Sequence, residues 1–410
     1  MRNVAKTWLN AIQTLRDYDN TTLPNLVVSL AEQYSGKPAL ISETDSVTYV
    51  QLATRMERYA RWAIKAGMAG HTVAMMMDNS VDYVILWLAL TRVRCTVALI
   101  NAHLRGAAFT HCLNVAEAKY LIVSPEHYAA VNYASIKPTL KQNLTTFVWT
   151  DLHHDKDDPR RIVDLNDLLP INPDDRALLI YTSGTTGYPK ATIITHRRII
   201  EWSAWFKGMT QATDTDRLYN CLPMYHSVGG VVAVGSMLLA GATVIVRAKF
   251  SSSRFWADIN EYGCTIFQYI GELCRYLVTN SIKSPEETSH KLRLAVGNGL
   301  QADVWRRFQR LFHVPQILEF YAATEGGLSL YNVEGKVGAL GRIPPYLGMA
   351  VELIEVDVDT LEPIRNEYDF CEHSRIGNSN GLLAPPPQEH PPAPPAGSVP
   401  RPQRAGAARS

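Results

Sequence analysis

The sequence predicts an α/β fold made of mainly parallel sheets covered by helices. The main observation is that short apolar runs of strand length alternate with longer segments of helical periodicity, which is the pattern of consecutive βαβ units. The composition, with 46% apolar and 19% charged residues in a chain of 410, is that of a globular protein with a large core. We find no repeat of fixed period, so a solenoid is not expected.

The first half of the chain contains five apolar runs of strand length and three longer segments with apolar residues at helical spacing. The expected strands are residues 73–77, 96–100, 120–123, 146–149 and 177–181. The expected helices are residues 49–66, 81–92 and 107–116. Because helices of this length can connect successive strands, the strands are expected to pair in parallel.

The same alternation continues in the second half. The expected strands are residues 192–195, 218–222, 243–246, 265–269, 292–296 and 316–320. The expected helices are residues 255–262, 272–280 and 302–311. A second group of βαβ units is therefore expected after the first.

The chain is expected to divide into three parts. Residues 1–176 would form a first α/β subdomain, and residues 177–383 a second one that contains the nucleotide-binding motifs. Residues 384–410 contain nine prolines and six alanines and almost no large apolar side chain. Such a segment cannot build a core, so we expect a disordered tail.

Charge and cysteine usage narrow the function classes. Forty Lys and Arg against 39 Asp and Glu leave a formal charge of +1, which offers no general electrostatic surface for nucleic acid. The six cysteines form no C-x-x-C pair, so neither a zinc site nor a disulfide framework is expected. Residues 1–20 contain no apolar run of signal-peptide length. These features predict a cytoplasmic protein, with peripheral membrane association left open.

Residues 227–246 are the one candidate for a membrane span, because these 20 residues contain no charge. Four glycines interrupt the run, and residues 240–243 have the composition of a turn. We therefore expect a buried helix followed by the strand at 243–246, with a membrane span as the alternative.

The strongest motif is the segment TSGTTGYPK from Thr182 to Lys190, called here the phosphate loop, which follows an expected strand. Its glycines let backbone N–H groups turn toward an anion, its hydroxyl side chains add donors, and Lys190 adds a positive charge. The Walker pattern G-x-x-x-x-G-K-[ST] is absent, and a strand instead of a helix is expected to follow. The segment predicts a polyphosphate site, and the alternative is a Thr- and Gly-rich hairpin turn without a ligand.

With the preceding tyrosine, the run YTSGTTGYPK at residues 181–190 resembles the phosphate-loop signature of adenylate-forming enzymes, which include acyl-CoA synthetases, luciferases and peptide-synthetase adenylation domains. Three later segments resemble, in order, the family's acyl-pocket motif, adenine loop and Y-G-x-T-E motif. They are LPMYHS at 222–227, GNGL at 297–300 and YAATEG at 321–326. Residues 269–277 and the VGNGL segment resemble the fatty acid transport protein or very-long-chain acyl-CoA synthetase branch, and the resemblance extends over about residues 25–371.

This resemblance implies that the chain is the large N-terminal domain of such an enzyme, acting on a long-chain or very-long-chain fatty acid. The fatty acid carboxylate would attack ATP to give an acyl adenylate and pyrophosphate. Coenzyme A, as co-substrate, would then accept the acyl group. The implied ligands are therefore a fatty acid, ATP with Mg²⁺, and CoA.

The resemblance also implies roles for individual residues. The expected nucleotide-binding residues are Tyr181, Thr182, Ser183, Gly184, Thr185, Thr186, Gly187, Lys190, Gly297, Asn298, Gly299 and Tyr321. The expected catalytic residues are Thr324, which would donate to the α-phosphate, Glu325, which would hold Mg²⁺, and His226 on the acyl-carboxylate side. Tyr321 would stack on adenine. Considered alone, His226 fits a core or turn histidine equally well, and Thr324 with Glu325 fits an exposed turn.

The sequence departs from the family pattern at several points. Ala322 stands where glycine is usual, and residues 368–371 replace a turn that commonly contains glycine. The family's ribose-binding aspartate, hinge and C-terminal lysine have no recognisable counterpart before the Pro-rich segment. We therefore expect impaired chemistry, and a non-catalytic nucleotide- or lipid-binding protein is the alternative.

A rival interpretation starts from residues 297–302, which fit G-x-G-x-x-A after an expected strand. Glu319 lies 20 residues after Gly299, at the end of the next strand. This is the outline of a dinucleotide-binding fingerprint, and hence of a NAD-dependent oxidoreductase. The rival explains neither the phosphate loop nor Thr324 and Glu325, so adenylation is the preferred interpretation.

Overall fold

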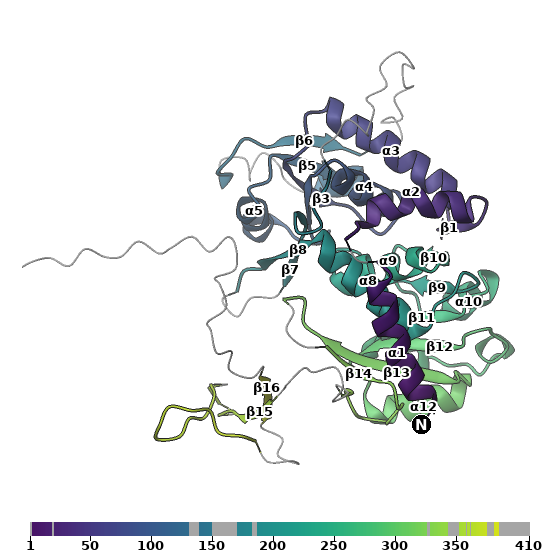
Figure 1. Ribbon diagram of the computed structural model, residues 1–410. Coiled ribbons are helices and arrows are strands. Elements are labelled where there is room, and N and C mark those ends of the chain that lie inside the picture. The colour runs from purple at the N-terminus through teal and green to yellow at the C-terminus, as the bar shows by residue number, and fades with distance from the viewer. Residues whose placement is uncertain are drawn as a thin grey trace, which may run out of the picture. The chain divides into compact units, whose positions relative to one another are not determined.

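The computed structural model of the chain describes residues 2–18, 20–130, 139–149, 170–182, 187–325, 329–342, 352–357, 359–360, 362–374 and 381–384. They fall in two compact units, Met1–Arg342 and Ile343–Ser410. The first unit contains two mainly parallel sheets with helices packed against them, which confirms the predicted α/β class (Figure 1).

The smaller sheet has six strands in the order β6-β5-β3-β4-β7-β8. They are β3 (Thr72–Met76), β4 (Thr96–Leu99), β5 (Tyr120–Val123), β6 (Thr145–Val148), β7 (Arg176–Thr182) and β8 (Lys190–Thr195). All neighbours are parallel except β8, which is antiparallel to β7. The helices of this region are α3 (Tyr49–Lys65), α4 (Val81–Arg92), α5 (Gly106–Val115) and α6 (Pro125–Ala130).

The larger sheet has eight strands in the order β14-β13-β12-β11-β9-β10-β1-β2. They are β1 (Pro38–Ile41), β2 (Ser46–Thr48), β9 (Arg217–Asn220), β10 (Thr243–Val246), β11 (Ile266–Ile270), β12 (Leu294–Asn298), β13 (Gln316–Ala322) and β14 (Ser329–Asn332). Only the edge strands β2 and β14 pair antiparallel among these described strands. The helices are α1 (Arg2–Arg16), α2 (Leu23–Tyr34), α8 (His196–Thr210), the π-helix η4 (Ser227–Val232), α9 (Ala233–Leu239), α10 (Phe255–Glu261), α11 (Gly271–Thr279), the short η5 (Pro285–Glu287) and α12 (Ala302–Phe312).

Each strand and helix expected from the sequence is present, with ends that differ by no more than two residues from the predicted ones. Several elements were not predicted: α1, α2, α6, α8 and the short strands β1, β2 and β14. Strands β2 and β14 contain no continuous apolar run of strand length, and β1 has only three apolar residues after a proline. The missed helices depend on tertiary packing, as α1 illustrates.

Helix α1 packs against α8. Trp8 is fully buried, with its ring centroid 6.0 Å from that of Trp205 and 6.3 Å from that of Tyr331. A Cβ added at Gly208 of α8 would lie 2.3 Å from the Cα of Ala11, so the two helices meet backbone to backbone there. Tertiary contact of this kind, and not local propensity, is what stabilises most helices.

The uncharged segment 227–246 is not one continuous helix. It consists of η4, α9, a turn at Gly241 with φ of +67°, and strand β10. The buried helix, the turn and the strand agree with the prediction made from its glycines. Throughout the part of the chain that the structure describes, helices fall short of the length and hydropathy needed to cross a membrane.

The strands of the two sheets come from interleaved parts of the chain. Strands β1 and β2, near the N-terminus, join the larger sheet, whereas β7 and β8 complete the smaller one. The expected boundary between residues 176 and 177 falls at the start of β7, so it does not coincide with the division between the sheets.

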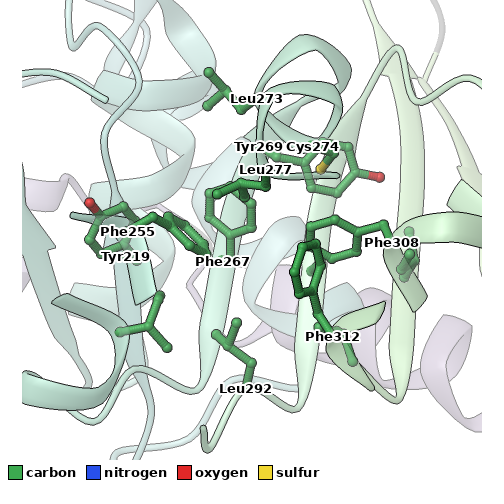
Figure 2. Close-up of a cluster of buried hydrophobic side chains, with 14 of the residues drawn as sticks. Tyr219, Phe255, Phe267, Tyr269, Leu273, Cys274, Leu277, Leu292, Phe308 and Phe312 are labelled. Carbon is green, nitrogen blue, oxygen red and sulfur yellow. The ribbon is translucent and has the colours of Figure 1, made fainter. Parts of the chain in front are cut away.

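The core of the larger sheet is rich in aromatic rings, as Figure 2 shows. Phe255 of α10 lies 4.6 Å from Phe267 of β11 and 5.2 Å from Tyr219 of β9, measured between ring centroids. Phe308 and Phe312 of α12 extend the cluster. Packing of this kind holds the strands rigidly, so that the loops at their ends start from fixed positions.

The second unit contains β15 (Glu352–Glu355), which pairs antiparallel with β16 (Gly381–Ala384). Residues 368–371, one of the departures from the family pattern, form a turn in which Asp369 has φ of +66° and Arg365 pairs with Cys371. Apart from its first residue, the expected tail at 384–410 lies outside the described residues.

Candidate functional site

Three of the motifs lie at one edge of the larger sheet. The acyl-pocket motif follows β9, the adenine loop begins in the last residues of β12, and the Y-G-x-T-E motif begins in the last residues of β13. These strands run parallel to one another through β11. Because the carboxyl ends of parallel strands share an edge, the three motifs come together there, where α/β sheets commonly bind ligands.

The phosphate loop joins β7 to β8, and Thr182 pairs with Lys190 across this hairpin. The strand expected after the loop is therefore present. Gly187 has φ of +93°, a conformation that favours glycine, and the Lys190 side chain is exposed. Ser183, Gly184, Thr185 and Thr186 lie outside the described residues.

Two tyrosines, Tyr181 just before the phosphate loop and Tyr188 within it, have different environments. Tyr181 is buried, and its hydroxyl donates to the backbone oxygen of Cys112 at 2.7 Å. Burial raises the pKa of Tyr181, and its side chain supports the loop from the core. The Tyr188 ring is exposed and stacks on His111 of α5 with 4.8 Å between centroids. Tyr181 was expected to contact the nucleotide, but its side chain is buried and offers no exposed group for such a contact.

Two positions of the adenine loop can accommodate only glycine. A Cβ added at Gly297 would lie 2.1 Å from the backbone oxygen of Tyr269, and Gly299 has φ of +78°. Glycine is required at both positions for these reasons. Between them, the Oδ1 atom of Asn298 is buried and has no hydrogen-bond partner in the described structure. An unpaired buried acceptor costs free energy, so this atom is suited to receive a donor from a ligand.

Tyr321 and Thr324 lie in the Y-G-x-T-E motif, at and beyond the end of β13. The Tyr321 side chain is 46% exposed, which leaves a ring face free for stacking. The Thr324 hydroxyl lies 3.2 Å from the hydroxyl of Ser227, the last residue of the acyl-pocket motif. The structure thus brings together two motifs that are almost 100 residues apart in sequence.

Glu325 is held through its backbone. Its carbonyl oxygen accepts a hydrogen bond of 2.9 Å from Nη2 of Arg198 on α8, while its side chain is exposed. The Arg198 guanidinium also lies 5.2 Å from the centroid of the Trp202 ring. A carboxylate on a fixed backbone is a suitable ligand for Mg²⁺, which prefers oxygen.

His226 precedes η4. Its N–H donates to the backbone oxygen of Pro223 at 3.2 Å, and its own carbonyl accepts from Gly230 at 2.9 Å. The His226 ring lies 4.6 Å from that of Tyr225. Although solvent reaches the side chain, the surrounding groups desolvate the ring and lower the pKa of His226. The imidazole is therefore neutral at neutral pH.

Glu319, the acid of the rival dinucleotide fingerprint, is only 3% exposed. It accepts a hydrogen bond of 2.6 Å from the Tyr269 hydroxyl and one of 3.0 Å from the N–H of Leu300. Burial raises the pKa of Glu319. A ribose-binding acid must face the ligand, so this buried and doubly bonded carboxyl argues against the oxidoreductase interpretation.

A separate cluster of side chains has spacing compatible with a metal. The ligand atoms of Asp78, Glu126 and His127 lie within 4.8 Å of one another. His127 Nε2 lies 2.9 Å from Asp78 Oδ1, so an ordinary ion pair or hydrogen bond accounts for the closest approach.

Sequence reasoning missed the residues that support the motifs from a distance. Arg198 contacts a residue 127 positions away, and no local pattern marks it. Asn79, between β3 and α4, contacts the acyl-pocket motif 143 positions away. The sequence here predicted only the helix at residues 81–92, which the structure shows to be capped by Ser80.

Comparisons with known proteins show the family and the fold of this chain. The family model described as AMP-binding enzyme matches residues 29–367. The chain is 38% identical to long-chain fatty acid transport protein 1 of Mus musculus over 384 residues, which cover 88% of this chain and 58% of that protein. It is 34% identical to long-chain fatty acid transport protein 6 of Homo sapiens over 383 residues, covering 88% and 60%. The chain therefore spans less than two thirds of the length of these relatives.

Solved structures show the same fold. A long-chain-fatty-acid-CoA ligase from Archaeoglobus fulgidus matches with a TM-score of 0.70 and 21% identity, over 85% of this chain and 73% of that one. Mycobacterium smegmatis MbtA matches with a TM-score of 0.72 and 19% identity, over 90% and 68%. At these identities the likeness concerns the fold, and it confirms the predicted fold class.

Proposed function

This chain belongs to the AMP-binding enzyme family, and we propose that it uses ATP to activate a long-chain or very-long-chain fatty acid. The acid would be joined to AMP and then passed to CoA. The curated relatives, which are named as long-chain fatty acid transport proteins, support this substrate class. The proposal depends most on the contact of 3.2 Å between Ser227 and Thr324, which joins the acyl-pocket motif to the Y-G-x-T-E motif.

The nucleotide would lie across the carboxyl edge of the larger sheet. Gly299 adds no side chain at this edge, and Tyr321 offers an exposed ring for the adenine to stack on. The unpaired Oδ1 of Asn298 can accept a hydrogen bond from the adenine amino group. These residues fit an adenine nucleotide, because each offers a contact that the protein itself leaves unused.

The phosphates would lie between the phosphate loop and the turn after β13. Lys190 supplies a positive charge to the departing pyrophosphate, and Thr324 donates to the α-phosphate, where negative charge increases in the transition state. Glu325 would hold Mg²⁺, which neutralises phosphate charge. Arg198 keeps the backbone of Glu325 in place.

His226 would lie beside the fatty acid carboxylate. Because desolvation lowers the pKa of His226, its imidazole is neutral and can donate one hydrogen bond. A neutral donor orients the carboxylate and leaves its negative charge available for attack on phosphorus. A cation at this position would instead stabilise the carboxylate as an ion pair and lower its nucleophilicity.

The test is exchange of labelled pyrophosphate into ATP in the presence of a long-chain fatty acid, followed by acyl-CoA formation after CoA is added. We expect fatty-acid-dependent exchange with the wild-type chain. Thr324→Val should lower the exchange rate about 10²-fold, as expected when one donor to a developing charge is lost. The matched control is Thr215→Val, which changes an exposed threonine outside the motifs and should leave exchange unchanged.

The outcomes separate the alternatives. Exchange without acyl-CoA formation would limit the function to adenylation. Binding of ATP and fatty acid without exchange would support the non-catalytic alternative. A wild-type chain that binds neither ligand would contradict the proposal.

We further propose that the protein works in the cytoplasm with peripheral contact to membranes, because its apolar substrate partitions into them. Sedimentation with phosphatidylcholine vesicles, with and without fatty acid, tests this location. Recovery of all the protein in the supernatant under both conditions would contradict peripheral binding.

A further inference from the structure

The proposed chemistry requires the two sheets to keep a fixed position relative to each other. The phosphate loop belongs to the smaller sheet, through β7 and β8, whereas the acyl-pocket motif, the adenine loop and the Y-G-x-T-E motif belong to the larger one. Reacting groups must approach to about 3–3.5 Å, and a misplacement of about 1 Å can cost roughly 10²-fold in rate. A residue of the smaller sheet that fixes the acyl-pocket motif would therefore matter for catalysis.

Asn79 makes this connection. It lies after β3 of the smaller sheet, directly before Ser80, the N-cap of α4. Its Nδ2 donates to the backbone oxygen of Leu222 at 2.8 Å and to that of Arg247 at 3.0 Å. Its Oδ1 accepts from the N–H of Met224 at 2.8 Å. One amide group thus binds the loops that follow β9 and β10 in the larger sheet.

Two of these bonds hold residues 222–224, the first half of the acyl-pocket motif, at either end. The Leu222 carbonyl precedes Pro223, and the Met224 N–H follows it, so the Asn79 amide pairs with the motif much as a neighbouring strand would. The third bond attaches the same amide to Arg247. The Arg247 side chain is itself fixed by ion pairs of 3.3 Å to Asp258 and Glu43.

Two glycines of η4 pack closely against the same backbone. A Cβ added at Gly229 would lie 2.7 Å from the Pro223 oxygen, and one added at Gly230 would lie 1.9 Å from the Met224 oxygen. The segment 222–224 is therefore packed against the glycines of η4 as well as bonded to Asn79, and a shift of this segment would move the start of that helix. The start of η4 positions His226 and Ser227.

We propose that Asn79 is a positioning residue for the acyl half of the site. It fixes the backbone of the acyl-pocket motif against the smaller sheet, and through it the ring of His226 and the hydroxyl of Ser227. This role rests on the proposed function, because it assigns the fatty acid carboxylate to His226. The hydrogen bonds of the Asn79 side chain in the described structure go to Leu222, Met224 and Arg247 and not to the adenine loop or the Y-G-x-T-E motif, so its loss should affect the fatty acid more than ATP.

The first experiment measures amide hydrogen exchange by mass spectrometry in Asn79→Asp and Asn79→Ala. Asn79→Asp preserves the shape of the side chain and the acceptor for Met224, but removes the hydrogen bonds donated to Leu222 and Arg247. It replaces the alanine variant in the experiment if that variant folds poorly. Exchange in peptides that span residues 222–230 should become at least about 10-fold faster, which corresponds to the loss of about 1.4 kcal/mol of local protection. Unchanged exchange in both variants would overturn the proposed clamp.

The matched control is Asn260→Ala. The Nδ2 of Asn260 also donates to two backbone oxygens, those of Trp256 and Glu286, both at 3.0 Å. It binds neither the acyl-pocket motif nor its neighbours. Exchange in residues 222–230 should therefore stay at the wild-type rate in this variant.

The second experiment titrates each variant with a fluorescent long-chain fatty acid and, separately, with Mg·ATP. We expect fatty acid affinity to fall about 10-fold in the Asn79 variants, with ATP affinity within about twofold of wild type. Retained ATP binding shows that the variants are folded. Faster exchange with unchanged fatty acid affinity, or an equal loss of both affinities, would overturn the positioning role. A wild-type chain that binds no fatty acid would contradict the proposed function, and the exchange data alone would then decide whether Asn79 clamps the motif.

Discussion

The histidine that begins α8 should make the fold sensitive to acid. His196 is 1% exposed, and neither of its ring nitrogens has a hydrogen-bond partner in the described structure. Burial lowers the pKa of His196 from 6.5 to about 4. Protonation would place an unpaired imidazolium in the core, so the folded chain resists it while the unfolded chain does not.

The magnitude follows from these two pKa values. The difference between about 4 in the folded chain and 6.5 in the unfolded chain corresponds to about 3.4 kcal/mol, at about 1.36 kcal/mol per pH unit. Because the folded pKa is the lower one, this stability is fully present above pH 6.5 and is lost as the pH falls toward 4. Linkage gives a loss of about 2.4 kcal/mol between pH 7 and pH 4.5.

The assay is urea unfolding, followed by tryptophan fluorescence, at pH 7 and pH 4.5. Wild type should lose about 2 kcal/mol more stability than His196→Phe over this interval, because the phenylalanine cannot take up the proton. His103→Phe, which changes an exposed histidine, is the control and should behave like wild type. If wild type and His196→Phe lost stability in parallel, to within about 0.5 kcal/mol, the argument from burial would be refuted.

Three further predictions concern the site and its support. Glu325→Ala should weaken Mg·ATP binding by about 1.5–3 kcal/mol in calorimetric titration, because a charged metal ligand is lost; unchanged affinity would remove Glu325 from the metal site. Gly297→Ala should abolish ATP binding and lower the melting temperature, since its Cβ would lie 2.1 Å from the Tyr269 oxygen and displace the adenine loop; normal binding with a normal melting temperature would show that this close packing is not needed. Gly208→Ala should separate α1 from α8 and make α1 an early site of limited proteolysis, because its Cβ would lie 2.3 Å from the Cα of Ala11; wild-type digestion would show that the helices can adjust.

Local chemistry was enough to predict most of the fold. The five-residue run of β3 and the helix beginning at Val81 are determined by neighbouring residues, through apolar period and capping. Strand β1 was missed because it opens with a proline followed by only three apolar residues, and because it is stabilised by pairing with β10, roughly 200 positions later. A pattern search over a short window cannot detect such a partner.

The same distinction holds for the candidate site. Gly299 and Lys190 could be named from the sequence because motifs preserve local spacing. Arg198 and Asn79 could not, since each acts on a loop more than 120 positions away. The sequence also gave no sign that Tyr181 faces the core, where its hydroxyl binds Cys112. Alternation along β7 decides which way each side chain points, and the buried face of that strand is known only once the sheet is formed.

Because the strands of the two sheets come from interleaved parts of the chain, the order of synthesis on the ribosome matters for folding. Leu40 of β1 pairs with Val244 of β10, so the N-terminal hairpin emerges long before its partner is translated. During this interval, the edge of β1 and the apolar face of α2 remain exposed while the smaller sheet is completed by β8. Such a nascent chain exposes an unpaired strand edge and apolar surface, which favour aggregation and make it a natural client for chaperones. Slow folding is also expected, because closing such a long loop precedes any gain from the contact.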